Sequence, residues 1–496
     1  MKIMLLNTMA AKNIKTNVIE AMHNHSRLFG FCIFRFYNYL TINALSIRSY
    51  ICMKYKFLLV LSAILFAHLF FNKGYEKGTR TIENDKGGYY VYLPAVFIYH
   101  DLARLEFFRT VDSVYKPNGG RMYAIYGAPA TGRRFVKYSM GTALCEMPMF
   151  LLAHTYCHIT RQFAANGYTV PYRISILFST IIFVMTGLWF LHKLLLRYFP
   201  DKIVFAVLVL LLFGTNLYCY STFDAGMSHP FTFGLFCMML YTTDTWTMTG
   251  QKKYALLTGA LLGIIVIVRP INLMMIIIPF SWQVYNIGSL KNRLRFFRDH
   301  AGSIAASALA CFAILLLQMS YWKYTTGQWL FFSYVDECFH FSDPHIWDGL
   351  MSYRKGWYVY TPVAFIATLG FISLWCYRRA FVPPLLSFLC MYIYVVFCWW
   401  QWFYGGSFGC RALIDILPMM AIPLCAFIQL VSSLKNKRSH YGVITMLLLL
   451  IILNIFQTYQ YSLGTIHYCE MNRDYYWRIF GKEKATDDDW KLLNLH

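Results

Sequence analysis

Two carboxylates, Glu83 and Asp85, are placed where they could do chemistry. They follow an apolar run (57–71) and precede a glycine pair and an aromatic stretch, 89–100, which predicts a helix lying at a membrane interface. A carboxylate held there can act as a general base toward a hydroxyl group. Lys86 beside Asp85 would favour the ionised form of the acid. The alternative is that Asp85 only caps the helix that follows.

Basic residues stand at points where a membrane edge is expected. Arg269 separates two apolar arms, Arg354-Lys355 directly precede another apolar run, and Arg411 follows a glycine-rich turn. Such charges are costly without a partner, and a guanidinium pairs well with phosphate. We therefore expect Arg269, Arg354 and Arg411 to converge on one anion-binding cavity. Two alternatives stay open: Arg269 snorkels to the headgroups, and Arg411 pairs with Asp415 one helical turn later.

Two further motifs could bind substrate. In Ser228-His229-Pro230, Ser and Pro are natural first residues of a helix, which leaves His229 to point into a cavity on the outer side. The stretch 399–411 joins an aromatic cluster to the turn Tyr404-Gly405-Gly406. Aromatic faces stack on sugar rings, and exposed glycine amides can cradle a phosphate.

The acids of the long polar segment 321–356 could hold a metal ion, but they have no fixed ligand spacing. They are Asp336, Glu337, Asp343 and Asp348. For Asp343 and Asp348 we favour solvated loop positions. A divalent metal stays an open possibility, and we expect no other cofactor.

The composition indicates what kind of elements must position these residues. Of 496 residues, 58% are hydrophobic and 14% charged, and the mean hydropathy is +0.44. Charged residues make up roughly a quarter of a soluble domain, so a soluble globular protein, a disordered chain and a nucleic-acid binder are excluded. The net charge of +22 instead suits cytoplasmic loops rich in Lys and Arg. We predict an all-α, polytopic helical membrane protein.

Eleven apolar runs are expected to cross the membrane, each of them near the roughly 20 residues that a span needs. They are 57–71, 174–191, 203–220, 230–243, 254–268, 271–285, 301–318, 357–375, 381–398, 412–431 and 443–459. A further apolar segment, 142–158, would break the alternation of sides. Since it contains Glu146, Pro148 and His154, we expect it to be re-entrant or interfacial.

The charge bias predicts the orientation. The links 192–202, 251–253, 286–300, 377–380 and 432–440 hold fourteen Lys and Arg but two acids, and should be cytoplasmic. This orientation predicts three parts of the chain: a cytoplasmic leader or upstream mis-start (1–52), a transmembrane domain (53–459) and an extracytoplasmic tail (460–496). Two large extracytoplasmic loops, 72–138 and 321–356, belong to the transmembrane domain, and we expect interfacial helices in the first of them.

Taken in order, the motifs resemble the GT-C-type integral-membrane glycosyltransferases, the superfamily of protein O-mannosyltransferases, aminoarabinose transferases and oligosaccharyltransferase catalytic subunits, and within it an uncharacterised bacterial branch. The stretches that carry the resemblance are Asp85-Lys86-Gly87-Gly88-Tyr89-Tyr90, Lys137-Tyr138-Ser139-Met140-Gly141, Met227-Ser228-His229-Pro230, Arg269-Pro270-Ile271-Asn272, Ser352-Tyr353-Arg354-Lys355-Gly356 and Tyr404-Gly405-Gly406-Ser407-Phe408-Gly409 with Arg411 and Asp415.

The resemblance implies transfer of a sugar from a polyprenyl-phosphate-linked donor to an extracytoplasmic lipid, glycan or protein acceptor, with inversion at the sugar. It implies an acid in the first outer loop that activates the acceptor. Asp85 occupies that position, and Glu83 competes for it. The donor phosphate would be held by Arg269, Arg354, Lys355 and Arg411. Substrate contacts would come from His229, Tyr89, Tyr90, Lys137, Tyr404, Gly405 and Gly406. We expect a bacterial inner-membrane protein, in contact with membrane lipids and with its site facing the periplasm, and no nucleic-acid partner.

Two other functions stay open. An O-antigen polymerase or ligase would need arginines in a late outer loop but not Asp85. A transporter or flippase for lipid-linked sugars should show internal repeats and broken helices, and the sequence contains no repeat.

Overall fold

The computed structural model describes residues 61–62, 64–65, 81–115 and 122–493. The chain divides into two compact units, Met1–Ile64 and Leu65–His496, and the account below concerns the second. The expected leader 1–52 lies outside the described residues, as do most of the apolar run 57–71 and the first residues of the loop 72–138.

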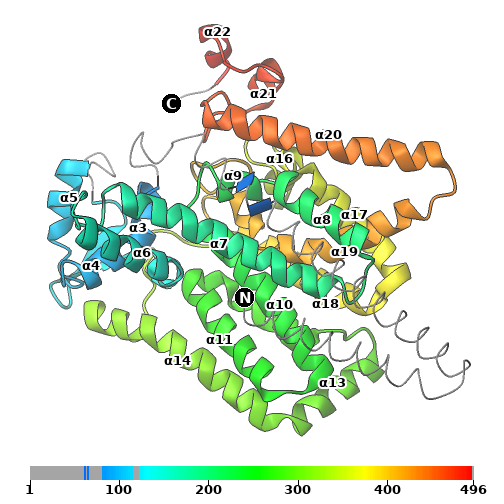
Figure 1. Cartoon of the computed structure of the whole chain (residues 1–496), viewed down its shortest axis with the longest axis horizontal. Coiled ribbons are helices and arrows are strands. Elements are labelled where there is room, and N and C mark those ends of the chain that lie inside the picture. The colour runs from blue at the N-terminus through cyan, green and yellow to red at the C-terminus, as the bar shows by residue number, and fades with distance from the viewer. Residues whose placement is uncertain (1–60, 63, 66–80, 116–121, 494–496) are drawn as a thin grey trace, which may run out of the picture. The chain divides into compact units, whose positions relative to one another are not determined.

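The middle of the chain is a series of long helices (Figure 1). In order these are α6 (Gly141–Thr160), α7 (Val170–Leu195), α8 (Asp201–Phe213), α9 (Leu217–Ser221), α10 (Ser228–Thr249), α11 (Lys252–Val268), η1 (Pro270–Ile276), α12 (Ile277–Ser281), α13 (Ile287–Asp299) and α14 (Ala301–Thr326). Helix α11 ends at Val268 because Pro270 disfavours a helical conformation for Arg269, the residue before it, which is extended.

The second half continues in the same way. Its elements are α15 (Ile346–Met351), α16 (Trp357–Tyr360), α17 (Pro362–Arg378), η2 (Arg379–Phe381), α18 (Val382–Phe397), η3 (Arg411–Ile414), α19 (Leu417–Ser432), α20 (Lys437–Ser462), α21 (Arg473–Ile479) and α22 (Asp487–Trp490). Proline opens α7, α17, α18 and α19, where its missing N–H costs no hydrogen bond.

Four helical stretches within the described residues are long and apolar enough to cross a membrane: 170–195, 301–326, 362–397 and 437–462. The mostly helical fold and the membrane character are therefore confirmed, but the count of eleven spans is not. Several expected runs are not single helices: run 357–375 covers α16 and α17, and run 412–431 covers η3 and α19. Run 203–220 divides into α8 and α9, and run 271–285 forms η1 and the short α12, which contains Pro279. Segment 142–158 lies within α6, and whether it crosses the bilayer stays a prediction.

Small residues set how closely the helices pack. Helix α10 is largely buried and lies between α7 and α11, and α14 packs on α11 (Figure 1). A Cβ on Gly187 of α7 would meet the Cα of Gly234 in α10, and one on Gly259 of α11 would meet the backbone of Ser307 in α14. Glycine at such crossings lets two backbones approach, as is common between helices in membranes.

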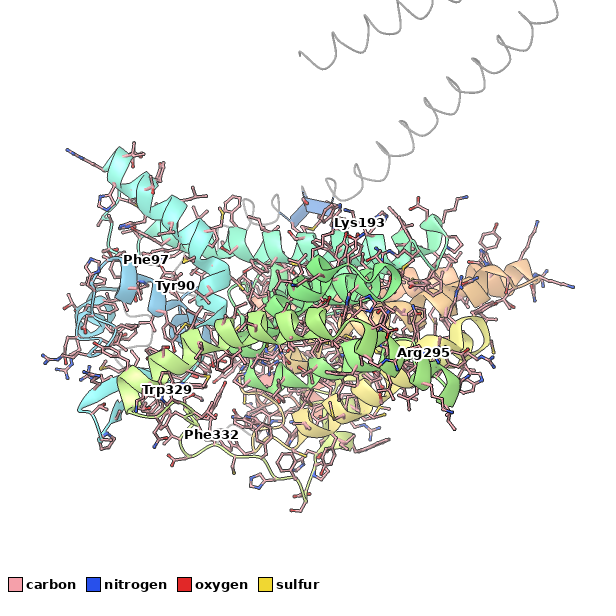
Figure 2. All side chains as sticks on the ribbon, turned by 90° about the horizontal axis from the view of Figure 1, so that it is seen from below. Tyr90, Phe97, Lys193, Arg295, Trp329 and Phe332 are labelled. Atoms are coloured by element: carbon pink, nitrogen blue, oxygen red, sulfur yellow. The ribbon has the colours of Figure 1, made fainter. Side chains whose placement is uncertain are left out.

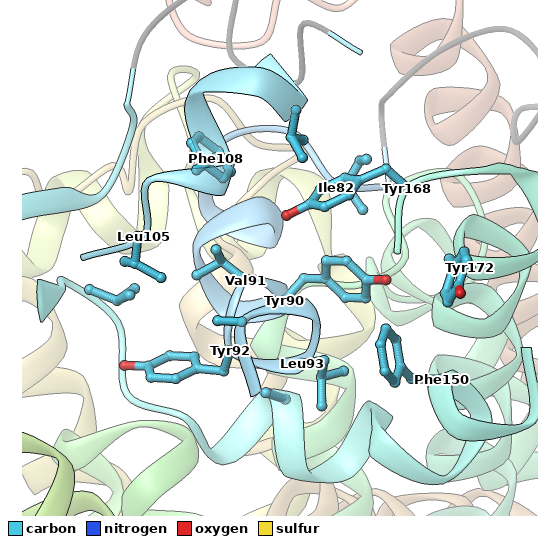
Figure 3. Close-up of a cluster of buried hydrophobic side chains, with 14 of the residues drawn as sticks. Ile82, Tyr90, Val91, Tyr92, Leu93, Leu105, Phe108, Phe150, Tyr168 and Tyr172 are labelled. Carbon is cyan, nitrogen blue, oxygen red and sulfur yellow. The ribbon is translucent and has the colours of Figure 1, made fainter. Parts of the chain in front are cut away.

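Segment 72–138 holds short helices where the sequence predicts interfacial ones: α3 (Asn84–Tyr90), α4 (Tyr92–Phe97) and α5 (Phe107–Tyr115). It also holds an antiparallel hairpin, β1 (Ile125–Ala128) and β2 (Arg133–Val136), which the expectation of an all-α fold did not include. An aromatic core attaches this loop to α6 and α7 (Figure 3). There Tyr90 packs against Phe150 and Tyr168, with ring centroids 5.8 Å apart in both pairs.

Candidate active site

Segments far apart in sequence enclose one cavity of about 1260 Å³, called the central cavity below. Its wall comes from α3, the segment after β2, the start of α10, the turn before η1, the loop after α14, the glycine-rich turn 404–406 and the chain after α20. Ten of the thirteen predicted site residues line it: Glu83, Asp85, Tyr89, Lys137, His229, Arg269, Tyr404, Gly405, Gly406 and Arg411.

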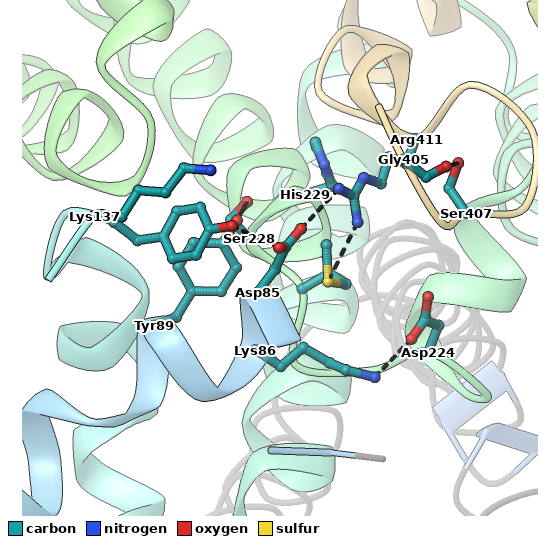
Figure 4. A network of polar contacts seen from close by, with 12 residues as sticks. Asp85, Lys86, Tyr89, Lys137, Asp224, Ser228, His229, Gly405, Ser407 and Arg411 are labelled. Atoms are coloured by element: carbon teal, nitrogen blue, oxygen red, sulfur yellow. Dashed lines mark hydrogen bonds and ion pairs between the residues drawn. The ribbon is translucent and has the colours of Figure 1, made fainter. Parts of the chain in front are cut away.

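Asp85 and Arg411 form an ion pair at the charged end of the central cavity (Figure 4). Arg411 Nη2 donates to Asp85 Oδ2 at 2.7 Å, and the two side chains are 13% and 15% exposed. The hydroxyls of Tyr123 and Tyr138 donate to Asp85 Oδ1 at 2.7 and 2.5 Å. Burial raises the pKa of Asp85, but Arg411 and the two phenols outweigh burial and hold this pKa at about 2. Asp85 is therefore a carboxylate at any physiological pH.

One alternative and one expectation about this pair are wrong. Arg411 pairs with Asp85 and not with Asp415, because residues 411–414 form a 3₁₀ turn that does not place positions four apart on one face. Lys86 does not support the charge of Asp85. Its ammonium points away and pairs with Asp224 at 2.7 Å (Figure 4).

Gly88 leaves the space in which the ring of Tyr138 reaches the carboxylate of Asp85. A Cβ on Gly88 would stand 2.6 Å from Cδ2 of Tyr138, so a side chain at this position would displace the ring that donates to Asp85. Gly87 and Gly88 lie inside helix α3 and are buried. The glycine pair therefore serves close approach between α3 and Tyr138.

Asp415 is the centre of a second cluster, and its side chain is fully buried. His229 Nδ1 lies 2.9 Å from Asp415 Oδ1, and Arg269 Nη1 donates to Oδ2 at 2.5 Å. Asn272 and Tyr392 also donate to Oδ2, at 3.2 and 2.9 Å. Both Arg269 and His229 line the central cavity, so this buried acid holds a cation and an imidazole at its wall.

The alternative that paired Asp415 with Arg411 named the wrong arginine, and sequence reasoning missed Tyr392. A tyrosine inside an apolar run gives no signal of its own. Asn272, three residues after Arg269 in a conspicuous polar motif, gave a signal that could have been used.

Lys137 forms a third charged contact. Its ammonium lies 2.5 Å from Glu337 Oε1 and 5.3 and 5.2 Å from the ring centroids of Tyr138 and Tyr334. Glu337 comes from the loop after α14, where the sequence suggested a solvated or metal-binding acid. The contact joins segments 72–138 and 321–356 at the central cavity.

Three predicted site residues do not line the central cavity. Arg354 donates to both carboxylate oxygens of Glu470 at 2.7 and 2.9 Å and lies 3.6 Å from the ring centroid of Phe403. Lys355 donates to the carbonyls of Ser407 and Tyr468 and is 2% exposed. Tyr90 lies in the aromatic core, and its hydroxyl donates to the carbonyl of Gly167.

The expected convergence of the three arginines is therefore wrong for Arg354. The chain after α20 supplies a carboxylate and a carbonyl that satisfy Arg354 and Lys355 without any ligand. Burial lowers the pKa of Lys355 to about 7.

One part of the central cavity is apolar. Its lining includes Ile271, Met274, Phe331, Phe332, Phe339, Phe341, Met391, Val395 and Trp399, called the apolar wall below. A charged end beside an apolar wall suits an amphiphile with an anionic group.

No group of three or more His, Cys, Asp or Glu that could hold a metal ion occurs among residues 81–115 and 122–493.

No family model matches this chain, and no curated protein matches it. Similar solved structures are those of the oligosaccharyltransferase from Archaeoglobus fulgidus. Its apo form is 12% identical over 88% of this chain and 59% of its own, with a TM-score of 0.42. AglB in complex with an inhibitory peptide and a dolichol-phosphate is 12% identical over 82% of this chain and 55% of its own, with a TM-score of 0.39. The chain thus spans little more than half the length of these enzymes.

Proposed function

We propose that this protein is a membrane glycosyltransferase of the GT-C type, which transfers a sugar from a polyprenyl-phosphate-linked donor to an extracytoplasmic acceptor. The observation that carries the proposal is the composition of the central cavity: an ionised carboxylate, Asp85, among the cations Arg411, Arg269 and Lys137, next to the apolar wall. The phosphate of the donor suits the cations and its prenyl chain suits the apolar wall.

In the proposed reaction, an acceptor hydroxyl oxygen attacks the anomeric carbon of the donor sugar. The bond between this carbon and the phosphate oxygen breaks, and its electron pair leaves with the phosphate. The hydroxyl proton passes to the carboxylate of Asp85. Arg411 and Arg269 stabilise the charge that develops on the phosphate, in a site partly shielded from water. Attack from the face opposite the leaving phosphate inverts the sugar.

The pair of Asp85 with Arg411 couples donor binding to base strength. A carboxylate with a pKa of about 2 is a weak base. A phosphate that takes over hydrogen bonds from Arg411 weakens its hold on Asp85, and the pKa of the acid rises because its strongest stabilising partner is shared. Asp85 then becomes a better proton acceptor only when the donor is bound.

The location follows from the same proposal. The acceptor and the sugar of the donor meet on the extracytoplasmic face, and the protein lies in the bacterial inner membrane with lipids around it. Glu83, which also lines the central cavity, is the second candidate for the base.

Purified full-length protein in lipid nanodiscs would test the proposal. A panel of polyprenyl-phosphate sugars is offered with mixed glycan, lipid and peptide acceptors, and the release of polyprenyl phosphate is measured. We expect release that depends on one donor sugar and needs an acceptor. Transport of an intact lipid-linked sugar between leaflets without release would instead support a flippase.

A further inference from the structure

The chain after α20 forms a wall of the central cavity that the proposed chemistry does not use. Among its lining residues are His467, Tyr468 and Trp490, which lie between α20 and the end of α22. The wall contrasts with the charged end, since none of these three side chains carries a permanent charge. We call these three residues the tail platform.

The backbone of the tail platform is fixed. The N–H of Ser407, in the glycine-rich turn, donates to the carbonyl of Tyr468 at 2.9 Å, and Lys355 Nζ donates to the same carbonyl at 2.6 Å. Two residues later, Glu470 accepts the bidentate contact from Arg354. The tail is therefore attached to the glycine-rich turn and to the residues before α16.

The side chains of the tail platform form a connected set of rings. The rings of His467 and Tyr468 have centroids 4.5 Å apart, and those of His467 and Trp490 6.1 Å apart. Trp490 also packs on Tyr475 with centroids 5.6 Å apart. Tyr468 is nevertheless 59% exposed. A large aromatic side chain on a fixed backbone that stays open at a cavity is a binding feature, because it pays little entropy when it is covered.

The hydrogen bonds of His467 define which of its nitrogens carries the proton. Its Nδ1 accepts from the backbone N–H of Cys469 at 3.3 Å and of Glu470 at 2.8 Å. Burial and the nearby Lys355 lower the pKa of His467, so the ring is neutral at pH 7. The proton then resides on Nε2, which is left as a hydrogen-bond donor.

We propose that the tail platform is the carbohydrate subsite of this protein and binds a neutral sugar of the acceptor. This inference rests on the proposed function. The C–H face of a sugar ring lies on Tyr468 and Trp490, and a sugar hydroxyl accepts from His467 Nε2. The subsite does not suit a phosphate, because Arg354 is taken by Glu470 and Lys355 is buried behind the backbone. The donor is already placed by the charged end and the apolar wall, so the sugar on the tail platform belongs to the acceptor.

Saccharide binding would test this subsite without turnover. Full-length protein in nanodiscs is titrated with methyl glycosides of neutral hexoses and N-acetylhexosamines, and binding is followed by saturation-transfer NMR. We expect wild type to bind at least one glycoside. Tyr468→Ala should weaken this binding about tenfold or more, since the sugar loses the large, rigid aromatic face on which it lies. Its backbone carbonyl, which anchors the tail, stays in place.

Matched variants separate a local from a structural effect. Trp490→Ala should also weaken glycoside binding. Trp477→Ala removes an exposed indole of the same tail that does not line the central cavity, and should bind as wild type does. Affinity for polyprenyl phosphate should stay within twofold of wild type in Tyr468→Ala.

Two results would overturn the inference: no glycoside of the panel binds, or Tyr468→Ala binds as tightly as wild type. Sugar transfer by wild type together with unaffected binding by Tyr468→Ala would refute the subsite alone. Glycoside binding that behaves as expected in a protein that transfers no sugar from any donor would refute the proposed function. The platform would then not be an acceptor site, and the inference would be overturned with it.

Discussion

At the scale of single residues, the site consists of charges that neutralise one another. Asp85 lies against Arg411, and Asp415 lies against Arg269 and His229. Buried pairs of this kind contribute little net stability but are costly to break, because the remaining partner is left without compensation. They are retained where the protein needs charge in a fixed place.

The first prediction concerns Asp415. Replacing it with Asn leaves Arg269 charged, buried and without its carboxylate, which should lower the free energy of unfolding by about 3–5 kcal/mol. Thermal unfolding in nanodiscs measures the effect, and Asp343→Asn, at an exposed loop acid, is the control. The double variant Asp415→Asn with Arg269→Gln should lose less than the sum of the two single variants. Strict additivity would contradict the pairing.

The second prediction concerns Lys355, whose pKa is lowered to about 7 by burial. In the unfolded chain the amine has a pKa near 10.4. Between these values the unfolded state binds more protons than the folded state, so stability rises with pH from about 7 to 10. Below pH 7 the cost of the buried charge is fully present. The slope approaches about 1.4 kcal/mol per pH unit.

Comparing Lys355→Met with wild type isolates this contribution. The variant should lack it, so the stability difference between the two proteins should change most between pH 7 and 10. Stability curves that stay parallel over this range would show that the amine titrates normally.

At the scale of elements, close contacts between helices depend on single small residues. Gly259→Leu should force α11 and α14 apart, because even a Cβ would overlap the backbone of Ser307. We expect a loss of about 1–3 kcal/mol, as for other overpacked cores. Gly302→Ala, in α14 with no neighbour within 4 Å of the added Cβ, is the control and should be neutral or slightly stabilising. Equal melting temperatures for both variants would contradict the packing.

Apolar runs predicted where helices lie because burial and span length depend on local composition. Runs 174–191 and 301–318 fall within α7 and α14. The partners of charges could not be predicted in this way. Arg354 and Lys355 are satisfied by a tail more than 100 positions later, and Arg411 by an acid 326 positions earlier. Spacing reveals only neighbours on one element, which is why Asp415 stood as the alternative partner of Arg411.

At the scale of the whole second unit, the two ends of the long helices carry different residues. Figure 2 shows Lys193 and Arg295 toward one end of the long helices and Tyr90, Phe97 and Trp329 toward the other. Lys193 and Arg295 come from two of the links rich in Lys and Arg, and Tyr90, Phe97 and Trp329 come from segments 72–138 and 321–356. This separation is what the bias of Lys and Arg between alternate links predicts.

The sidedness itself is the fourth prediction. Single cysteines introduced as Asp343→Cys and Lys437→Cys, in a background without the native cysteines, should react with a membrane-impermeant maleimide from opposite sides. In intact cells of a bacterial host with a permeabilised outer membrane, position 343 should label and position 437 should not until the inner membrane is opened. Labelling of both positions from one side would refute the topology.

The fifth prediction concerns the central claim, that Asp85 receives the acceptor proton. In nanodiscs with donor and acceptor at saturation, the measurement is the turnover of Asp85→Asn relative to wild type, with polyprenyl-phosphate affinity determined on the same samples. Asp343→Asn is the control, and Glu83→Gln tests the competing acid. We predict turnover lower by roughly 10²- to 10⁴-fold, the usual cost of losing a general base, with donor affinity near that of wild type. Normal transfer by Asp85→Asn would contradict the account, and loss in Glu83→Gln alone would assign the base to Glu83.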